Sequence, residues 1–131
     1  MILDTDICIE LIHKNEKVVG EYLTSKGTIH LCSMTVSELF YGVYNSSNVD
    51  FHFAKTVGFC SGFPTLNPNQ ESCRLFGQLK AHLRINGDII PDADLIIAST
   101  AMANNMILVS NNSKHFDRLT SFGLRIENWL K

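Results

Sequence analysis

The sequence lacks the features of a membrane protein, a secreted protein or a zinc-binding protein. Its longest apolar runs are broken by Asp, Lys or Asn before they reach the roughly 18 residues that a membrane-spanning helix needs. The opening residues contain no basic stretch followed by an apolar signal core, so we expect a cytoplasmic protein. No Cys-x-x-Cys or Cys/His pair has zinc-ligand spacing. The cysteines are interpreted as reduced core residues: Cys8, Cys32, Cys60 and Cys73.

An excess of basic residues is also missing. The chain has 11 Lys and Arg residues against 13 Asp and Glu residues, which gives a formal net charge of −2. Proteins that bind nucleic acids directly usually carry a basic face, so this balance counts against a nuclease. A nuclease interpretation therefore needs support from particular residues.

The composition indicates one globular domain that spans residues 1–131. Apolar residues make up 45% of the chain, which is enough for a sizeable core without disulfides or a structural metal. No internal repeat, low-complexity tract or linker divides the chain. Short apolar runs alternate with helical patterns. Because strands separated by helices need crossover connections, we predict an α/β fold in which helices cover both faces of a mostly parallel sheet.

Apolar periodicity and turn residues place the expected elements. We expect strands at residues 1–3, 28–32, 63–66, 106–109 and 124–126. The first helix should begin after Asp6, and the second helix should end at Gly27. Further helices are expected at residues 33–44, 50–60, 93–102 and 113–119, with a long one that ends near residues 86–87.

Three acidic residues stand just beyond an expected strand or in the opening turns of a helix: Asp4, Glu38 and Asp94. Ligands of parallel α/β sheets bind at the carboxyl ends of the strands, where Asp4 and the segment Ser110-Asn111-Asn112 are expected. Three converging carboxylates repel one another, and a hard divalent cation such as Mg²⁺ or Mn²⁺ relieves that repulsion. A cation held in this way retains waters that suit hydrolysis of a phosphodiester.

Each carboxylate also has a purely structural interpretation. Asp4 is suited to closing an Asx turn, and Glu38 stands three residues after Thr35, the spacing of a capping box. Asp94 is placed to offset the positive end of a helix dipole. Asp6 and Asp92 fit such capping roles better than metal ligation. None of the five histidines falls at the strand-end positions of the three carboxylates, so no histidine acid–base pair is indicated.

Five short motifs occur in order along nearly the whole chain. They are Leu3-Asp4-Thr5-Asp6; Ser37-Glu38-Leu39 with Tyr41-Gly42; Ile90-Pro91-Asp92-Ala93-Asp94 with Ile97-Ala98; Leu108-Val109-Ser110-Asn111-Asn112 with Phe116; and Glu127-Asn128-Trp129. In this order and at this length, the sequence resembles the PIN-domain toxins of the VapC type. The resemblance implies a three-layer PIN-like domain and a metal-dependent ribonuclease that acts on structured RNAs, transfer RNAs among them.

The resemblance also assigns roles to residues. Asp4, Glu38 and Asp94 take the catalytic and metal-binding positions, with Mg²⁺ or Mn²⁺ as the cofactor. Asn112 stands where many family members have a further acidic residue, and Ser110 is a candidate to orient a metal-bound water. The implied partners are RNA, a second copy of the chain, and a VapB-type antitoxin whose basic C-terminal segment enters the acidic pocket. DNA is then contacted only through the antitoxin.

Two other functions fit parts of the sequence. A haloacid-dehalogenase-type phosphohydrolase would use Asp4 as a nucleophile, but here Ser110 follows the GDxxxD segment at residues 87–92, whereas that family has the reverse order. A catalytically inactive PIN-fold binding module would explain Asn112. Its apolar surface would serve a homodimer or an antitoxin groove, and the candidate side chains suit the core equally well: Phe51, Phe53 and Phe59.

Overall fold

Five short strands form one parallel sheet in the computed structural model, which describes residues 1–131. The strands are β1 (Ile2–Leu3), β2 (His30–Cys32), β3 (Thr65–Leu66), β4 (Leu108–Val109) and β5 (Ile126–Glu127). Their order across the sheet is β3-β2-β1-β4-β5, and every neighbouring pair is parallel. The predicted α/β class and the parallel sheet are confirmed.

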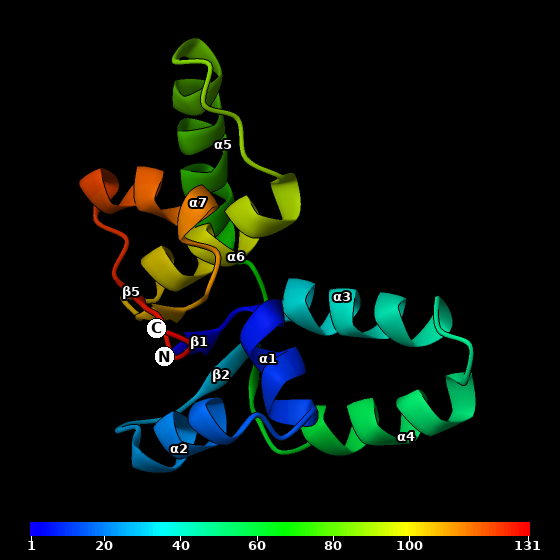
Figure 1. Cartoon of the computed structure of the whole chain (residues 1–131). Helices are drawn as coiled ribbons and strands as arrows, with labels where there is room; N and C mark the ends of the chain where they lie inside the picture. The colour runs from blue at the N-terminus through cyan, green and yellow to red at the C-terminus, as the bar shows by residue number, and fades with distance from the viewer.

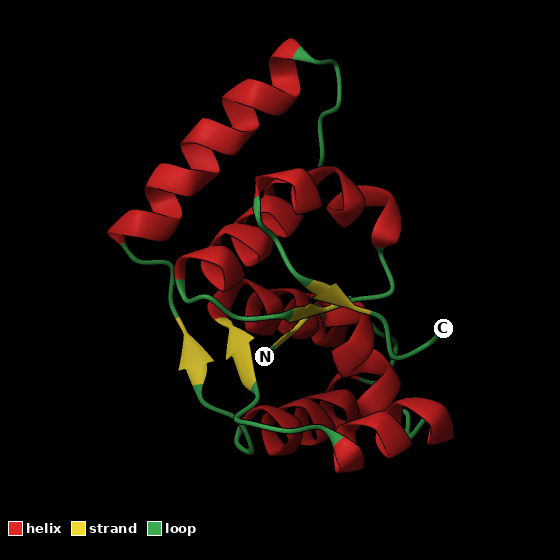
Figure 2. Cartoon of the chain, turned by 90° about the vertical axis from the view of Figure 1, so that its left-hand side faces the viewer, coloured by secondary structure: helices red, strands yellow, loops and turns green.

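Seven α-helices and one 3₁₀-helix connect and flank the strands. The α-helices are α1 (Thr5–Ile12), α2 (Glu16–Thr24), α3 (Ser33–Tyr44), α4 (Val49–Cys60), α5 (Gln70–Ile85), α6 (Asp92–Ala103) and α7 (Ser113–Phe116), and α7 leads into the 3₁₀-helix η1 (Asp117–Phe122). In Figure 1, α5, α6 and α7 lie above the sheet and α2 lies below it. Helix α1 stands beside β1 and β2, and α3 and α4 form a hairpin that projects sideways beyond it. Figure 2 shows the yellow strands between these two groups of helices. None of the helices is both long enough and apolar enough to cross a membrane.

Alternate strand residues enter two apolar cores on opposite faces of the sheet. Ile2 and Leu108 pack in one core with side chains from α5, α6 and η1. Leu3 and Val109 pack in a second core with side chains from α1 and α2. All four side chains are fully buried. Because successive strand residues point to opposite faces, strands of only two residues are enough to join the three layers.

Several boundaries differ from the predictions. The second helix ends at Thr24, because Gly27 belongs to the turn before β2, where its φ is +89°. The helix expected at residues 113–119 divides into α7 and η1. Cys8 and Cys32 are buried as predicted, but Cys73 lies on the solvent face of α5, so its interpretation as a core residue is wrong.

The α3–α4 hairpin exposes apolar side chains. Its 28 residues at positions 33–60 include only three charged residues, Glu38, Asp50 and Lys55. Phe51 and Phe53 lie at its surface, whereas Phe59 packs against the second core, with its ring centroid 5.0 Å from that of Phe63. Five of its side chains are between 42% and 71% exposed: Tyr41, Tyr44, Phe51, Phe53 and Val57. An apolar face of this kind indicates a surface for another protein.

Candidate active site

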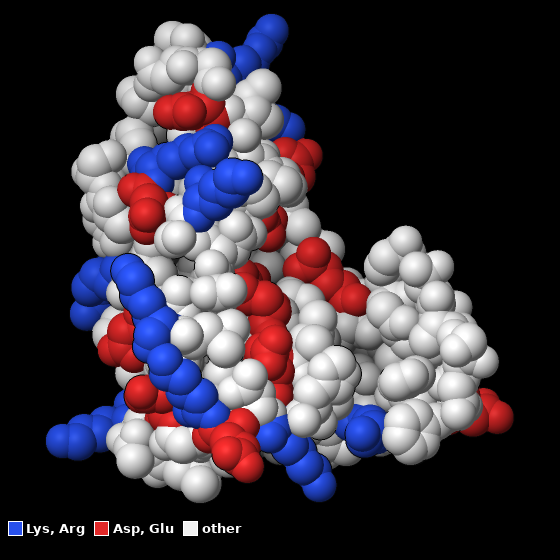
Figure 3. All heavy atoms as spheres, viewed as in Figure 1, with Lys and Arg blue, Asp and Glu red and all other residues white.

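An acidic pocket opens at the carboxyl ends of β1 and β4. It has a volume of about 390 Å³ and is lined by Asp4, Thr5, Asp6, Ile9, Glu38, Asp94, Asn111 and Asn112. The three carboxylates singled out in the sequence therefore face one space, although they come from the end of β1, from α3 and from α6. Figure 3 shows acidic side chains in a column across the middle of the molecule, beside the mostly uncharged surface of the α3–α4 hairpin.

Asp4 is the most deeply buried of these carboxylates, with 4% of its surface exposed. As the N-cap of α1 it accepts a hydrogen bond from the Thr5 backbone N–H, and its other oxygen accepts one from the Ser110 hydroxyl at 2.7 Å. Burial, followed by the nearby negative charge of Asp6, raises the pKa of Asp4 to about 7. An Asx turn needs the backbone N–H two residues on, so the Asx-turn interpretation is wrong: Asp4 instead caps α1 through the adjacent N–H of Thr5. Its carboxylate also lines the pocket.

Ser110 supports the pocket from beneath. Its buried hydroxyl donates to Asp4 and accepts the backbone N–H of Asn112 at 2.9 Å. Both hydrogen-bonding directions of this hydroxyl are therefore used inside the protein. Ser110 acts on the pocket through Asp4 and the Asn112 backbone. Its predicted role in orienting a metal-bound water stays a prediction.

Glu38 joins α3 to α1. Its carboxylate accepts a hydrogen bond from the Thr5 hydroxyl at 2.6 Å. The capping-box interpretation is wrong, because α3 begins at Ser33 and the Thr35 hydroxyl is buried in its first turn without a partner. Glu38 is thereby free to face the acidic pocket.

Asp94 lies in the first turn of α6, and its carboxylate contacts a histidine that the sequence interpretation did not select. The Asp94 Oδ2 atom lies 2.5 Å from His115 Nδ1 and 3.4 Å from Asn112 Nδ2. The one sequence signal for this contact is that His115 follows Asn112 by three residues, one turn into α7. Asp92, two residues before Asp94, instead pairs with Lys80 in solvent and stays outside the pocket.

Asp6 lines the pocket, which its interpretation as a helix-capping residue did not predict. Its two oxygens accept backbone N–H groups from Ile7 at 2.7 Å and from Asn111 at 3.0 Å, so it ties the start of α1 to the end of β4. Burial raises the pKa of this carboxyl above its usual value. Asp6 therefore combines a structural role with a fourth acidic group in the pocket.

No Lys or Arg neutralises these four carboxylates. None of the four forms an ion pair with Lys or Arg, and Asp94 contacts Nδ1 of His115 at 2.5 Å. The side chains share a pocket, but no three of them stand at the spacing of ligands around one ion. The donor set itself, carboxylate and amide oxygens around uncompensated negative charge, is the chemistry that a hard divalent cation prefers.

The chain has known relatives over nearly its whole length. The sequence profile described as "PIN domain" matches residues 1–121. This chain belongs to the PIN domain family. The assignment confirms the predicted resemblance and excludes the phosphohydrolase, whose motif order the chain also lacks.

This PIN domain is similar to proteins of the VapC type. It is 33% identical over 130 residues to ribonuclease VapC2 of Haemophilus influenzae, covering 98% of this chain and 97% of that protein. It is 33% identical over 129 residues to the tRNA(fMet)-specific endonuclease VapC of Shigella flexneri, covering 98% and 96%. A solved structure, VapBC2 of Rickettsia felis bound to a DNA fragment from its promoter, contains a chain with a TM-score of 0.87 and 34% identity, covering 98% and 97%. The three-layer fold and the VapC resemblance are both confirmed.

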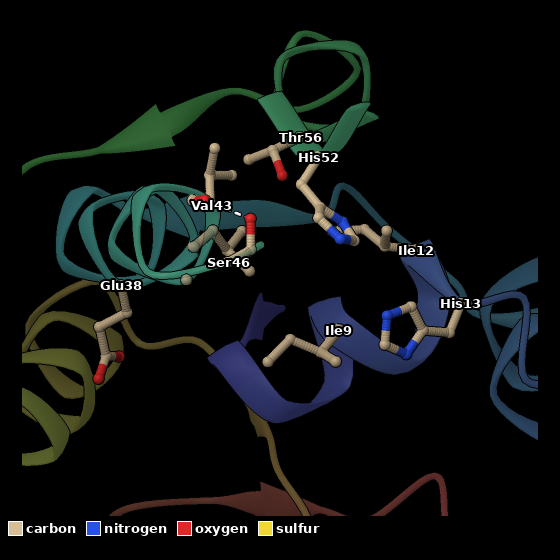
Figure 4. Close-up of a pocket in the computed structure, with 10 residues that line it drawn as sticks. Ile9, Ile12, His13, Glu38, Val43, Ser46, His52 and Thr56 are labelled. Atoms are coloured by element: carbon tan, nitrogen blue, oxygen red, sulfur yellow. Dashed lines mark hydrogen bonds between the residues drawn. The ribbon is translucent and has the colours of Figure 1, made fainter. Parts of the chain in front are cut away.

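An apolar groove adjoins the acidic pocket in this PIN domain. It lies between α1, α3 and α4, has a volume of about 230 Å³, and is lined by Ile9, Ile12, His13, Glu38, Leu39, Gly42, Val43, Ser46, His52 and Thr56. In Figure 4, Glu38 stands at one end, and His13 and His52 stand at the other. Ile9 and Glu38 line both the groove and the acidic pocket, so the two form one continuous surface.

Proposed function

We propose that this PIN domain is a metal-dependent endoribonuclease. The observation that carries the proposal is the acidic pocket at the carboxyl ends of the strands, which Asp4, Glu38 and Asp94 line together without a neutralising Lys or Arg. Its relatives, a ribonuclease and a tRNA(fMet)-specific endonuclease, support RNA as the substrate and transfer RNA as the first class to test.

Mg²⁺ or Mn²⁺ fits the chemistry of this pocket. Asp4, Glu38 and Asp94 would hold the cation, with the amide oxygen of Asn112 as a further neutral ligand. When bound, such a cation lowers the pKa of a coordinated water and stabilises negative charge on the phosphoryl group. The Ser110 hydroxyl and the Thr5 backbone N–H fix the carboxylate of Asp4 in place. Because Asn112 carries no charge, the negative charge of the proposed ligand set comes from the three carboxylates alone.

Cleavage of RNA by the purified chain tests the proposal. We expect the chain to cut transfer RNA in the presence of Mg²⁺ or Mn²⁺, to stop in EDTA, and to resume when the cation is restored in excess. Analysis of the reaction on a denaturing gel is sufficient. If the chain cuts equally well in EDTA, the metal dependence is refuted. If it fails to cut and neither cation changes its thermal stability, the inactive binding module becomes the better interpretation.

We also propose a VapB-type antitoxin as the protein partner. The related VapBC2 structure contains a toxin–antitoxin pair on DNA, and in this chain the apolar groove leads directly into the acidic pocket. This arrangement suits a partner with an apolar segment followed by basic side chains. RNA and the basic segment would then compete for the same carboxylates. DNA would be contacted through the antitoxin, as the absence of a basic excess in this chain favours.

A homodimer and a cytoplasmic location remain predictions. The tip of α5 and the segment after it supply a second exposed apolar area, with Ile85 83% and Ile89 69% exposed, separate from the α3–α4 hairpin. A second copy and an antitoxin therefore need not use the same surface. Sedimentation velocity of the purified chain measures whether it is a dimer, and a monomer at all concentrations would refute the first prediction.

A further inference from the structure

His115 contacts a pocket carboxylate without lining the pocket itself. Its Nδ1 atom lies 2.5 Å from Asp94 Oδ2, and the two side chains are 30% and 15% exposed. The other four histidines make no such contact: His13 and His52 line the apolar groove, His82 stacks on Phe122, and His30 belongs to β2. One imidazole in the molecule thus acts on the acidic pocket.

The hydrogen-bond donors and acceptors of His115, Asp94 and Asn112 determine how His115 contacts Asp94. An ionised carboxylate can only accept, so a hydrogen bond between the two groups requires the tautomer of His115 that carries its proton on Nδ1. Asn112 Nδ2 lies 2.8 Å from the same Nδ1 atom and 3.4 Å from Asp94 Oδ2. Because both nitrogens carry hydrogens, each directs one toward the shared acceptor, Asp94 Oδ2. One oxygen of Asp94 is thereby held from the β4–α7 side, while Oδ1 accepts no hydrogen bond from the protein.

The backbone that carries His115 is firmly anchored. Its neighbour Phe116 is fully buried in the apolar core that also contains Leu119. The Asn112 backbone N–H is held in turn by Ser110. The donors to Asp94 therefore come from a fixed segment, and their geometry can restrict the rotation of the Asp94 side chain.

We propose that His115 is a positioning residue for Asp94, acting through its Nδ1–H group. This role rests on the proposed function and deepens it. Asn112 and His115 both donate hydrogen bonds to Asp94 and so fix the orientation of its carboxylate. An acidic residue at position 112 would have no hydrogen to donate when ionised and could not do so. Groups that hydrogen-bond to ligating carboxylates typically contribute about 10- to 100-fold to metal affinity or activity.

Three substitutions of His115 separate this role from simple packing. His115→Phe keeps the ring shape but removes the donor. In His115→Asn the amide nitrogen occupies nearly the place of Nδ1, whereas in His115→Gln it reaches the place of Nε2, away from Asp94. His82→Phe is the control, because His82 is an exposed histidine on α5 that contacts Asn86 and Phe122.

The readout is the Mn²⁺ concentration dependence of thermal unfolding, measured without RNA, together with kcat and KM for RNA at limiting and saturating Mn²⁺. We expect His115→Phe and His115→Gln to weaken Mn²⁺ binding by about 10- to 100-fold. Their kcat should fall at limiting Mn²⁺ and recover at saturating Mn²⁺, with the KM for RNA unchanged. His115→Asn should stay within a few-fold of the parent chain, as should His82→Phe.

Equal Mn²⁺ affinity in the parent chain and in His115→Phe would overturn the positioning role, while leaving the ribonuclease proposal intact. If His115→Phe does not fold, the Asn and Gln variants decide, since equal losses in both would show that the Nδ1 position is not what matters. A parent chain that shows neither a Mn²⁺-dependent shift nor cleavage overturns the proposed function and this role with it.

Discussion

Asp94→Asn is expected to reduce Mg²⁺-dependent RNA cleavage by about 10²–10³-fold, the usual loss when one electrostatic element of a catalytic site is removed. The substitution keeps the size of the side chain but removes one of the carboxylates that line the pocket. The fold should survive, because removing a clustered negative charge relieves repulsion among the carboxylates. Glu38→Gln and Asp4→Asn should act in the same direction.

Asp92→Asn supplies a matched control on the same helix. Asp92 stands two residues before Asp94, but it lies in solvent, pairs with Lys80, and does not line the pocket. We expect its variant to cleave RNA at the parent rate. Initial rates on transfer RNA and circular dichroism melting curves of both variants are the measurements. Full activity of a folded Asp94→Asn variant would remove Asp94 from the proposed site.

Gly42→Trp is expected to separate the toxin from its antitoxin without affecting cleavage. Gly42 lines the apolar groove on the exposed face of α3, and a Cβ atom added there meets no atom within 4 Å. The first atom of an added side chain thus meets no obstacle beside the groove, and we expect a Trp side chain there to occupy the groove. Loss of a central interface contact typically costs about 2–4 kcal/mol, which corresponds to a roughly 30- to 1,000-fold weaker complex.

The comparison uses Gly20→Trp as its control. Gly20 lies on α2, is also exposed and unobstructed, and is not part of the groove. Each variant is co-expressed with the antitoxin of an adjacent reading frame, and growth and complex affinity are measured. Cells that carry Gly42→Trp should remain arrested, whereas the antitoxin should rescue cells that carry Gly20→Trp or the parent chain. Equal rescue in all three would place the antitoxin elsewhere.

The sequence was sufficient for the sheet and for three of the four pocket carboxylates. Apolar pairs such as Ile2-Leu3 and Leu108-Val109 indicated strands, and polar residues directly after them indicated the sheet edge. The position of Glu38 depended on the resemblance, because its spacing from Thr35 favoured a capping box. Only the observed start of α3 at Ser33 excludes that capping box.

His115 and Asp6 show where sequence periodicity is insufficient. The contact between His115 and Asp94 joins residues 21 positions apart, and it depends on how the four-residue α7 leaves β4. Asp6 caps backbone N–H groups as its position suggested, yet one of them belongs to Asn111, 105 residues further along the chain. Local patterns predict neither contact, because both are created by packing of the β4–α7 connection against α1 and α6.

The chemical ends of one purified cleavage product test the central claim most directly. A cation held by Asp4, Glu38 and Asp94 would supply an activated water, whose oxygen would bond to phosphorus while the bond to the 3′-oxygen breaks, so the 2′-hydroxyl would take no part. We predict a 5′-phosphate and a 3′-hydroxyl, and continued cleavage when the sugar at the cut carries a 2′-O-methyl group and still binds. A 2′,3′-cyclic phosphate formed in EDTA would contradict metal-dependent hydrolysis at Asp4, Glu38 and Asp94.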